Sequence, residues 1–284
     1  MNNIFIKLVI ILAIGAGATY FGLPYFDNSL LKSDINLIIG NKSKKESVKF
    51  NSNDFSKLPY IVKKYLRKSI KNNSTLPENC KMNVTGKMKK ARKDEWLEAS
   101  AENYYSTVTP EFLTITETKT SPFLWTQTID KYINNVASTK TKLLSLVPTY
   151  NFEGNKLNQS YLVLYLLESV FCPAVLLPNM NIHWKKIDNT KAMATIWDNN
   201  MRGNAIFHFN KNGDVIKVVT QDRYMPGELD YNRETFTLHL ANYKDVGDYY
   251  IPTYFEYEWN LAANNFTFGR FQILDISYNI PILE

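Results

Sequence analysis

Glu168 is the residue whose setting most suggests chemistry, because it is the one carboxylate inside an apolar run from Tyr161 to Phe171. A helix that is apolar on nearly every side is a buried helix. A buried carboxylate must be hydrogen-bonded, paired with a cation or protonated, because desolvating a bare charge is too costly. Burial would raise the pKa of Glu168, which could then act as an acid or base. A buried ion pair with Arg223 or Arg270 that fixes how the helix docks is the favoured alternative.

The tripeptide Asp222-Arg223-Tyr224 ends an apolar, strand-like run that begins at Val215. Polar residues at a strand end often lie at the mouth of a barrel, where sites form, and equally often they only terminate the strand. If the protein is an enzyme, the candidate catalytic residues are therefore Glu168, Asp222 and Arg223.

The segment 249–260 has two faces of different character, since residues i and i+2 of a strand point to the same side. Phe255, Tyr257 and Trp259 share one face with Thr253, and this face is a natural core or ligand-lining wall. The opposite face carries two carboxylates, which is more typical of a solvated surface than of an acid–base pair. The predicted ligand-binding residues are Trp125, Glu168, Trp184, Arg223, Tyr224, Phe255, Tyr257, Trp259 and Arg270.

No standard signature of a cofactor or metal site is present. The chain has no phosphate-binding glycine loop, no Gly-x-Ser-x-Gly, no His-Glu-x-x-His and no paired Cys-x-x-Cys. The three histidines, His183, His208 and His239, fall on three different predicted strands and are expected to be core or edge residues. Cys80 and Cys172 are too few for a disulfide framework, and they either pair with each other or stay as small buried apolar residues. We expect no cofactor and no metal.

Short alternating runs on both sides of the 161–171 helix predict antiparallel strands with one solvated face. Asn212-Gly213 and Gly247-Asp248 are expected to form hairpin turns. The predicted strands lie at 82–88, 96–107, 112–116, 124–128, 132–146, 192–197, 205–210, 215–224, 236–243, 249–260 and 266–278, with a further strand beginning at His183-Trp184. Apolar residues at helical spacing also predict an amphipathic helix over 58–70, which is expected to dock on the domain rather than lie on a membrane.

These elements predict a mainly β (α+β) protein. Its fold is a large curved antiparallel sheet or half-barrel, with one buried central helix and an N-terminal membrane helix. The expected organisation is an anchor or signal peptide over 1–26, a basic linker over 27–57 and a single β-rich domain over 58–284.

The N-terminal segment is uncharged from Leu8 to Phe26 and is long enough to cross a bilayer as a helix. A cleavable signal peptide is the rival interpretation, because Ala16-Gly17-Ala18 resembles a cleavage site. The apolar run continues beyond that site, which favours a retained single-pass anchor. The side of the membrane stays open, since the lysines after the segment favour a cytoplasmic body and the signal-like start favours export.

Positive charge is concentrated between Lys42 and Lys93, where 16 Lys and Arg face 3 Asp and Glu. The rest of the chain from Asp94 onward is acidic, with 15 Lys and Arg against 22 Asp and Glu. A basic stretch beside an anchor can bind anionic headgroups, and a solvated lysine-rich surface is the alternative. Nucleic-acid binding is not expected, because the aromatic residues lie mostly outside the basic segment and no motif of that class occurs.

Two groups of residues carry a resemblance to a known family. The first group runs Leu58-Pro59, Phe123-Leu124-Trp125, Tyr165-Leu166, Glu168, Pro173, Leu176-Leu177-Pro178, Trp184 and Ile187-Asp188; the second runs Asp222-Arg223-Tyr224, Gly247, Ile251-Pro252-Thr253, Glu256, Trp259, Gly269-Arg270-Phe271 and Tyr278. Over roughly 58–278 the chain resembles a bacterial domain-of-unknown-function family, DUF6920 (DUF6544-like). The resemblance implies no agreed activity and transfers no catalytic residue, but members often carry N-terminal hydrophobic segments.

Three functions are compatible with these patterns. A half-barrel with an aromatic, leucine-rich concave face can bind a lipid or another apolar ligand, and by fold-level analogy it is similar to periplasmic lipoprotein-carrier half-barrels. A membrane-bound hydrolase or isomerase would use Glu168 with Asp222 and Arg223, whose side chains would then converge on a pocket. A partner-binding scaffold would show a large exposed apolar patch and no cavity. Binding without catalysis is favoured.

Overall fold

The computed structural model describes residues 29–40, 49–51, 55, 58–178, 181–226 and 231–284. The predicted anchor or signal peptide at 1–26 lies outside the described residues. Among the helices that are described, none has the length and apolar character needed to cross a membrane.

Thirteen antiparallel strands form one sheet within the described residues. In the order of the sheet, the strands run β6-β5-β4-β3-β2-β1-β13-β12-β11-β10-β9-β8-β7. Their bounds are β1 Asn79–Met88, β2 Leu97–Ser106, β3 Phe112–Ser121, β4 Leu124–Ile133, β5 Val136–Leu143, β6 Val147–Glu153, β7 Ile182–Lys186, β8 Lys191–Asp198, β9 Met201–Phe209, β10 Val215–Pro226, β11 Tyr231–Val246, β12 Tyr249–Asn260 and β13 Asn265–Tyr278.

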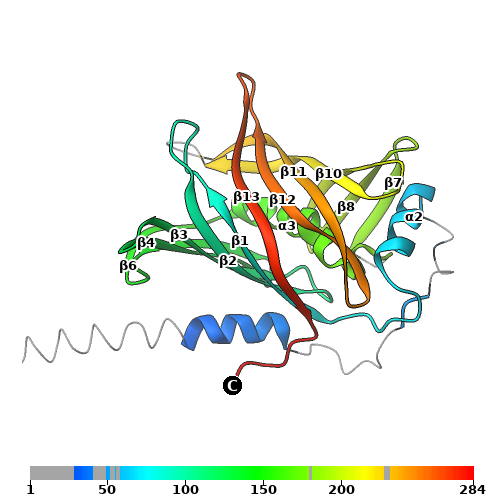
Figure 1. Ribbon diagram of the computed structural model, residues 1–284, viewed down its shortest axis with the longest axis horizontal. Helices are drawn as coiled ribbons and strands as arrows, with labels where there is room; N and C mark the ends of the chain where they lie inside the picture. Colours follow the sequence, from blue (N-terminus) through cyan, green and yellow to red (C-terminus); the bar gives the residue numbers. More distant parts are fainter. Residues whose placement is uncertain (1–28, 41–48, 52–54, 56–57, 179–180, 227–230) are drawn as a thin grey trace, which may run out of the picture.

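The sheet consists of two meanders, β1–β6 and β7–β13, in which strands that follow each other in sequence pair in space. The pairing of β1 with β13 joins the meanders, with Cys80 opposite Tyr278 at one end and Met88 opposite Gly269 at the other. The order of strands has two ends, at β6 and β7, so the sheet is open. Figure 1 shows it strongly curved around α3. The predicted curved antiparallel sheet with one central helix is therefore confirmed.

The central helix α3, Asn155–Glu168, continues as a 3-10 turn, η1 Ser169–Phe171, and a second one, η2 Pro173–Leu176. It leads from one edge strand, β6, to the other, β7, and contacts β4 and β5 of the first meander as well as β8, β9 and β10 of the second. Leu162, Val163, Leu166 and Leu167 are fully buried. The nearly all-apolar run thus lies inside the curve of the sheet, as expected of a helix with no solvated face.

Gly203 on β9 marks a close approach between the helix and the sheet. A Cβ atom at this position would overlap the Val163 Cγ2 of α3. Val163 itself has no exposed surface. The absence of a side chain at position 203 therefore sets how deeply α3 lies against β9.

The amphipathic helix α2, Tyr60–Ser69, confirms the helix predicted over 58–70. Its apolar face, which includes Val62 and Leu66, is buried in the main core, and the helix contacts β8, β12 and η2. Lys68 Nζ lies 2.5 Å from Asp214 Oδ1, next to the turn that joins β9 and β10. The helix therefore docks on the domain through both its apolar and its basic side.

Residues 29–39, which the sequence pattern places in a polar linker, are helical. Ile35 and Ile38 are buried against Tyr104 and Leu113 of β2 and β3, on the side of the sheet opposite to Tyr105 and Phe112. Asn36 Nδ2 also donates to the Leu283 carbonyl oxygen at 3.0 Å. The apolar residues of this short stretch are too few to stand out in a Lys- and Asn-rich sequence, and only their partners on the sheet reveal their role.

Two details of the strand pattern differ from the prediction. The run 132–146 is not one strand, because Asn134 and Asn135 have positive φ (51° and 67°) and turn the chain between β4 and β5. Strand β6 was not predicted; it is a mostly exposed edge strand, although Tyr150 and Phe152 alternate with polar residues in it. The hairpin turns at Gly213 (φ 89°) and Gly247 (φ 60°) are present as expected.

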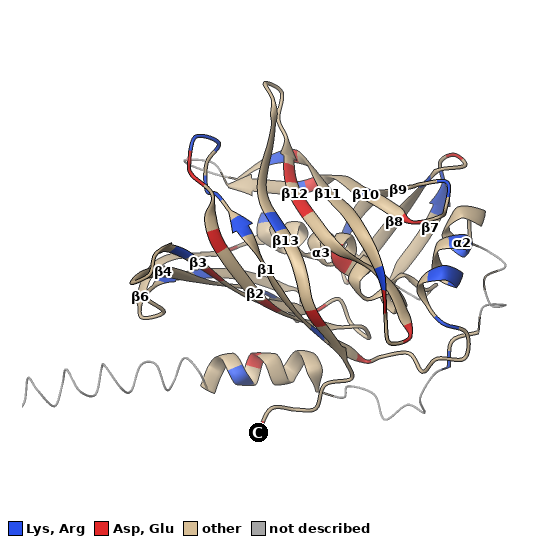
Figure 2. Cartoon of the chain, in the orientation of Figure 1, with Lys and Arg blue, Asp and Glu red and all other residues tan. Residues whose placement is uncertain are grey.

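The basic segment 42–93 does not form one continuous patch in the described residues. Figure 2 shows its Lys and Arg on α2 at one side of the molecule and at the β1–β2 turn on the other. Several of them pair with acids, such as Lys81 with Glu102 at 2.8 Å and Lys87 with Glu98 at 3.1 Å. The local excess of charge in the sequence is thus partly balanced by acids from neighbouring strands.

Candidate functional site

A partly open cavity of about 150 Å³ lies between α3 and the concave face of the sheet. It spans the seam between the two meanders, because β1 to β4 supply one part of its wall and β10, β12 and β13 supply another. Its lining residues are Val84, Met88, Ala101, Asn103, Phe112, Thr114, Thr116, Asp130, Tyr161, Leu164, Glu168, Arg223, Phe255, Tyr257, Phe268 and Phe271.

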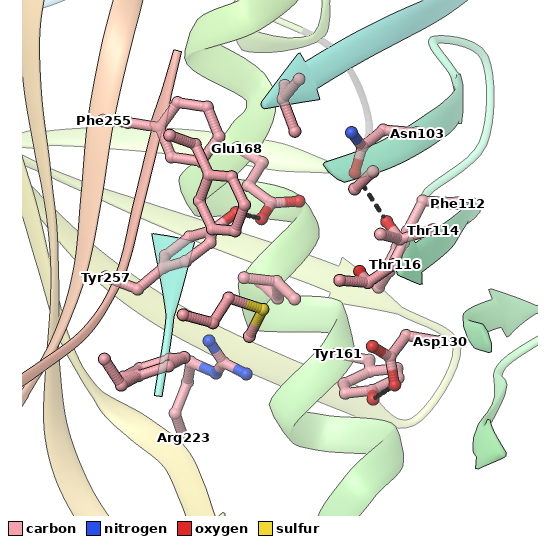
Figure 3. A pocket seen from close by; sticks show the side chains of 16 residues that line it. Asn103, Phe112, Thr114, Thr116, Asp130, Tyr161, Glu168, Arg223, Phe255 and Tyr257 are labelled. Carbon is pink, nitrogen blue, oxygen red and sulfur yellow. Dashed lines mark hydrogen bonds between the residues drawn. The ribbon is translucent and has the colours of Figure 1, made fainter. Parts of the chain in front are cut away.

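Regular secondary structure positions the polar side chains of this cavity. Tyr161, Leu164 and Glu168 stand at i, i+3 and i+7 of α3 and therefore share one helix face. Figure 3 shows Phe255, Tyr257 and Arg223 on one wall, and Asn103, Thr114, Thr116 and Asp130 on the facing wall. Glu168 reaches in from α3 between the two walls.

Glu168 is buried and accepts two tyrosine hydrogen bonds. Tyr105 of β2 donates to Oε2 at 3.0 Å, and Tyr257 of β12 donates to Oε1. Burial raises the pKa of Glu168 from its ordinary 4.5 to about 7, while the hydrogen bonds from Tyr257 and Tyr105 and the positive charge of Arg223 act in the opposite direction. Its carboxyl group can therefore change protonation state near neutral pH.

Replacing Tyr257 with phenylalanine is expected to raise the pKa of Glu168 further above about 7. The Tyr257 hydroxyl stabilises the ionised carboxylate, so its removal favours the protonated form. The carboxyl ¹³C shift of Glu168, followed by NMR through a pH titration, measures this change. Tyr254→Phe is the matched control, because the Tyr254 hydroxyl donates to Glu256 instead. An unchanged or lowered Glu168 pKa in Tyr257→Phe would contradict the assignment.

Arg223 brings a guanidinium group to the same cavity. Its side chain is buried, with 8% of the residue exposed, and its Nε donates to Ser160 Oγ of α3 at 3.3 Å. The guanidinium carbon lies 4.2 Å from the centre of the Phe236 ring and 5.4 Å from that of Trp259. Although burial lowers the pKa of Arg223, its ordinary value is so high that the group stays charged.

Asp130 of β4 is the third ionisable group of the cavity. Its Oδ1 accepts a hydrogen bond of 2.5 Å from the Tyr161 hydroxyl on α3. Burial raises the pKa of Asp130, whereas hydrogen bonds from Thr139 and Tyr161 and the positive charge of Arg223 act against the rise. Each carboxyl group of the cavity thus accepts at least one hydrogen bond from a tyrosine.

The remaining wall is aromatic. Phe255 packs against Phe171 with ring centres 4.9 Å apart and against Phe271 at 5.5 Å, and Tyr257 stacks on Phe268 at 5.8 Å. An apolar cavity with a few convergent polar groups is the usual form of a small-molecule site. This arrangement can therefore bind an apolar group and interact with one polar end of it.

Comparison with protein families assigns the chain to one of them. A model for a family of unknown function, DUF6544, matches residues 48–271. The chain belongs to the DUF6544 family. This agrees with the DUF6544-like part of the resemblance noted in the sequence, whereas the number DUF6920 is not the one that matches. No curated protein matches this DUF6544 member.

Three solved structures resemble this DUF6544 chain at low identity. One is a domain assigned as an outer membrane lipoprotein-sorting protein from Vibrio parahaemolyticus, 12% identical, with a TM-score of 0.39 over 70% of this chain and 85% of that chain. A DUF1329 family protein from Desulfovibrio piger is 8% identical, with a TM-score of 0.42 over 72% and 87%. A LolA superfamily protein from Nitrosomonas europaea is 11% identical, with a TM-score of 0.35 over 77% and 91%.

Four of the residues predicted as ligand-binding line the cavity: Glu168, Arg223, Phe255 and Tyr257. Trp259 does not line it but supports Arg223 from behind. The favoured ion pair of Glu168 with Arg223 or Arg270 is absent from the described residues, because Glu168 bonds to tyrosines instead.

The other predicted ligand-binding residues lie away from the cavity. Trp125 donates to Ser145 Oγ at 3.1 Å, near the β5–β6 turn, and Trp184 donates to the Leu176 carbonyl oxygen at 3.0 Å. The Tyr224 backbone nitrogen donates a hydrogen bond to Ser160 Oγ of α3 at 3.2 Å. Arg270 is exposed on the outer face, beside Glu256 and over Trp96.

Asp222 does not join Glu168 and Arg223. Its carboxylate pairs with Arg233 and accepts from the Asn204 backbone nitrogen at 2.9 Å. It lines a separate hollow with the outward-facing Met193 and Ile206. Neighbouring strand residues point to opposite faces, so only one member of the Asp222-Arg223 pair could enter the cavity.

Asp130, Tyr105 and the polar residues of β3 were not predicted as site residues. The period-two series Phe112, Thr114 and Thr116 does place three lining residues on one face of a strand. For Asp130 no such signal exists, because a lone aspartate in an alternating run is typical of a solvated face. Its place opposite Thr114 follows from strand register alone.

The histidines and cysteines contribute nothing to the cavity. His183, His208 and His239 lie on β7, β9 and β11, and in the part of the chain that the structure describes no group of His, Cys, Asp or Glu is placed to hold a metal ion. Cys80 and Cys172 are buried free thiols in the main core.

Proposed function

We propose that the protein binds a lipid or another apolar molecule in the cavity between α3 and the curved sheet. The observation that carries the proposal is the composition of the wall, in which aromatic and aliphatic side chains surround a few polar groups. A cavity of about 150 Å³ in an apolar core is large enough for a molecule of about the size of benzene. The bound part is then a short apolar group or one end of a longer chain that leaves through the open side.

In the first test, the full-length protein is purified in an amphipathic polymer. Mass spectrometry then identifies and quantifies the apolar molecules that remain bound to it. The proposal predicts a stoichiometric apolar ligand. Thr116→Phe places a ring in the cavity and should reduce the bound amount roughly tenfold, about 1.4 kcal/mol of binding free energy. Glu117→Phe is the matched control, because the next residue of β3 is not part of the lining. A protein that is empty and takes up no added alkyl ligand would exclude the proposal.

The enzymatic alternative requires Asp222 beside Glu168 and Arg223, but Asp222 lines a separate hollow and not this cavity. The scaffold alternative predicted an exposed apolar patch without a cavity. Exposed apolar side chains do occur at the hairpin tips, for example Phe123 and Val147, but a cavity is also present. Ligand binding accounts for both the aromatic wall and the polar groups that converge on it.

Membrane attachment through residues 1–26, and contact of the basic segment with anionic headgroups, stay predictions. A tether would hold the cavity close to a source of lipid. The separation of the basic side chains into two groups favours several weak contacts over one headgroup site.

A further inference from the structure

Arg223 is a buried cation without a carboxylate partner in the described part of the chain. The one hydrogen bond that the structure gives it runs from Nε to Ser160 Oγ, and its plane rests on the rings of Phe236 and Trp259. The terminal nitrogens of the guanidinium belong to the cavity wall, where Figure 3 shows them pointing inward. A buried charge is costly unless it is paired, and within the described residues no carboxylate is bonded directly to Arg223.

The two carboxyl groups of the cavity interact with the charge of Arg223, but in the described residues neither forms a hydrogen bond or an ion pair with it. Glu168 accepts hydrogen bonds from Tyr105 and Tyr257, and Asp130 accepts one from Tyr161. The tyrosines thus bind the carboxyl groups of Glu168 on α3 and Asp130 on β4. Arg223 instead contacts the rings of Phe236 on β11 and Trp259 on β12. The acids already accept hydrogen bonds, whereas within the described residues no hydrogen bond is shown for the terminal N–H groups of Arg223.

We propose that the ligand is a single-chain carboxylic acid whose carboxylate pairs with Arg223 and whose alkyl chain lies along the aromatic wall. This rests on the proposed function and specifies the chemistry of its ligand. A guanidinium presents two parallel N–H donors that match the two oxygens of a carboxylate. The chain would run past Phe255, Phe268 and Phe271, all of which line the same cavity.

The neighbouring acids favour a headgroup of low charge. Asp130 and Glu168 line the same cavity as Arg223, and in their ionised forms they repel a bound anion more strongly in a site of low dielectric than in water. A monoanionic carboxylate adds one negative charge, whereas a phosphate ester adds up to two. An amine headgroup would place a second cation beside Arg223.

Four ligands with the same eight-carbon chain separate these possibilities: octanoate, octanol, octylamine and octyl phosphate. Their affinities for the full-length protein in an amphipathic polymer are measured by calorimetry. Octanoate should bind at least about tenfold more tightly than octanol, since a hydrogen bond to a charged group contributes about 1.5–3 kcal/mol. Octylamine should bind most weakly and octyl phosphate less tightly than octanoate.

Variants of Arg223 test the residue itself. Arg223→Met keeps an apolar chain of similar length and should remove the preference for octanoate over octanol, while Arg223→Lys should keep part of it. Arg270→Met is the matched control, because Arg270 lies on the outer face. Thermal unfolding shows whether each variant folds. The ¹³C shift of carboxyl-labelled octanoate should show that the bound headgroup is ionised in the wild type.

Each result has a defined meaning. Equal binding of octanoate and octanol, or a preference that survives in Arg223→Met, would overturn the carboxylate proposal while leaving apolar binding intact. Tightest binding of octyl phosphate or octylamine would also overturn it. Failure of all four ligands to bind would instead count against the proposed function.

Discussion

Replacing Gly203 with alanine is expected to lower the free energy of unfolding by about 3 kcal/mol, the range of an overpacked core. The added Cβ would overlap Val163 Cγ2, and Val163 is fully buried in α3 and cannot move to solvent. Chemical denaturation of the variant and the wild type measures the change. Because α3 also carries Tyr161 and Glu168, displacement of the helix should weaken ligand binding as well.

A second substitution identifies the cause of this loss. Val163→Ala removes the methyl group that the new Cβ would meet, so the double variant Gly203→Ala/Val163→Ala should be more stable than the sum of the two single effects predicts. Residues in direct contact commonly couple by about 0.5–3 kcal/mol in such a cycle. Strictly additive effects would show that Gly203 does not limit the approach of α3 to β9.

Glu168→Gln is expected to change how stability depends on pH. The pKa of Glu168 is about 7 in the folded protein and 4.5 is its ordinary value, so the folded state holds the proton more strongly. The stabilisation that the protonated group provides is complete below about pH 4.5 and is lost as the pH rises through about 7. Glutamine does not titrate, and its variant lacks this loss.

The difference between the unfolding free energies of Glu168→Gln and the wild type should therefore shift in favour of the variant by about 3 kcal/mol between pH 4 and pH 8, at about 1.36 kcal/mol for each pKa unit. Taking the difference removes the contributions of all other titrating groups. Denaturation series at several pH values provide the measurement. A difference that does not vary with pH would mean that Glu168 titrates alike in the folded and unfolded protein.

Patterns within short segments of the sequence were enough to predict most of the elements. The apolar run at 161–171 predicts a buried helix, because no face of it can be left in water, and α3 with η1 occupies that place. Alternation predicts which face of β12 is buried, and Phe255 and Tyr257 do line the cavity. The hairpin turns at Gly213 and Gly247 follow from residues that tolerate positive φ.

The contents of the candidate site were predictable only in part. Glu168 could be identified as a buried acid that needs partners, but its partners, Tyr105 and Tyr257, come from strands on the two sides of the β1–β13 seam. No local pattern reports which strands meet, since pairing depends on the whole sheet. Asp130 lies in the site because the register of β4 places it opposite Thr114 of β3. In the sequence alone, its alternating run is typical of a solvated face.

Asp222 and Arg223 show what only the tertiary structure decided. The two residues are adjacent, and the sequence leaves open whether both lie at the mouth of one site or only end the strand. A register shift in β10 between Thr220 and Arg223 sets which of them points inward, because one extra residue in a strand exchanges the two faces beyond it. The sequence by itself determined that this chain builds a curved β sheet around one apolar helix carrying a buried acid. The tertiary structure decided which charges meet inside it, because strand pairing and register bring together residues that lie far apart along the chain.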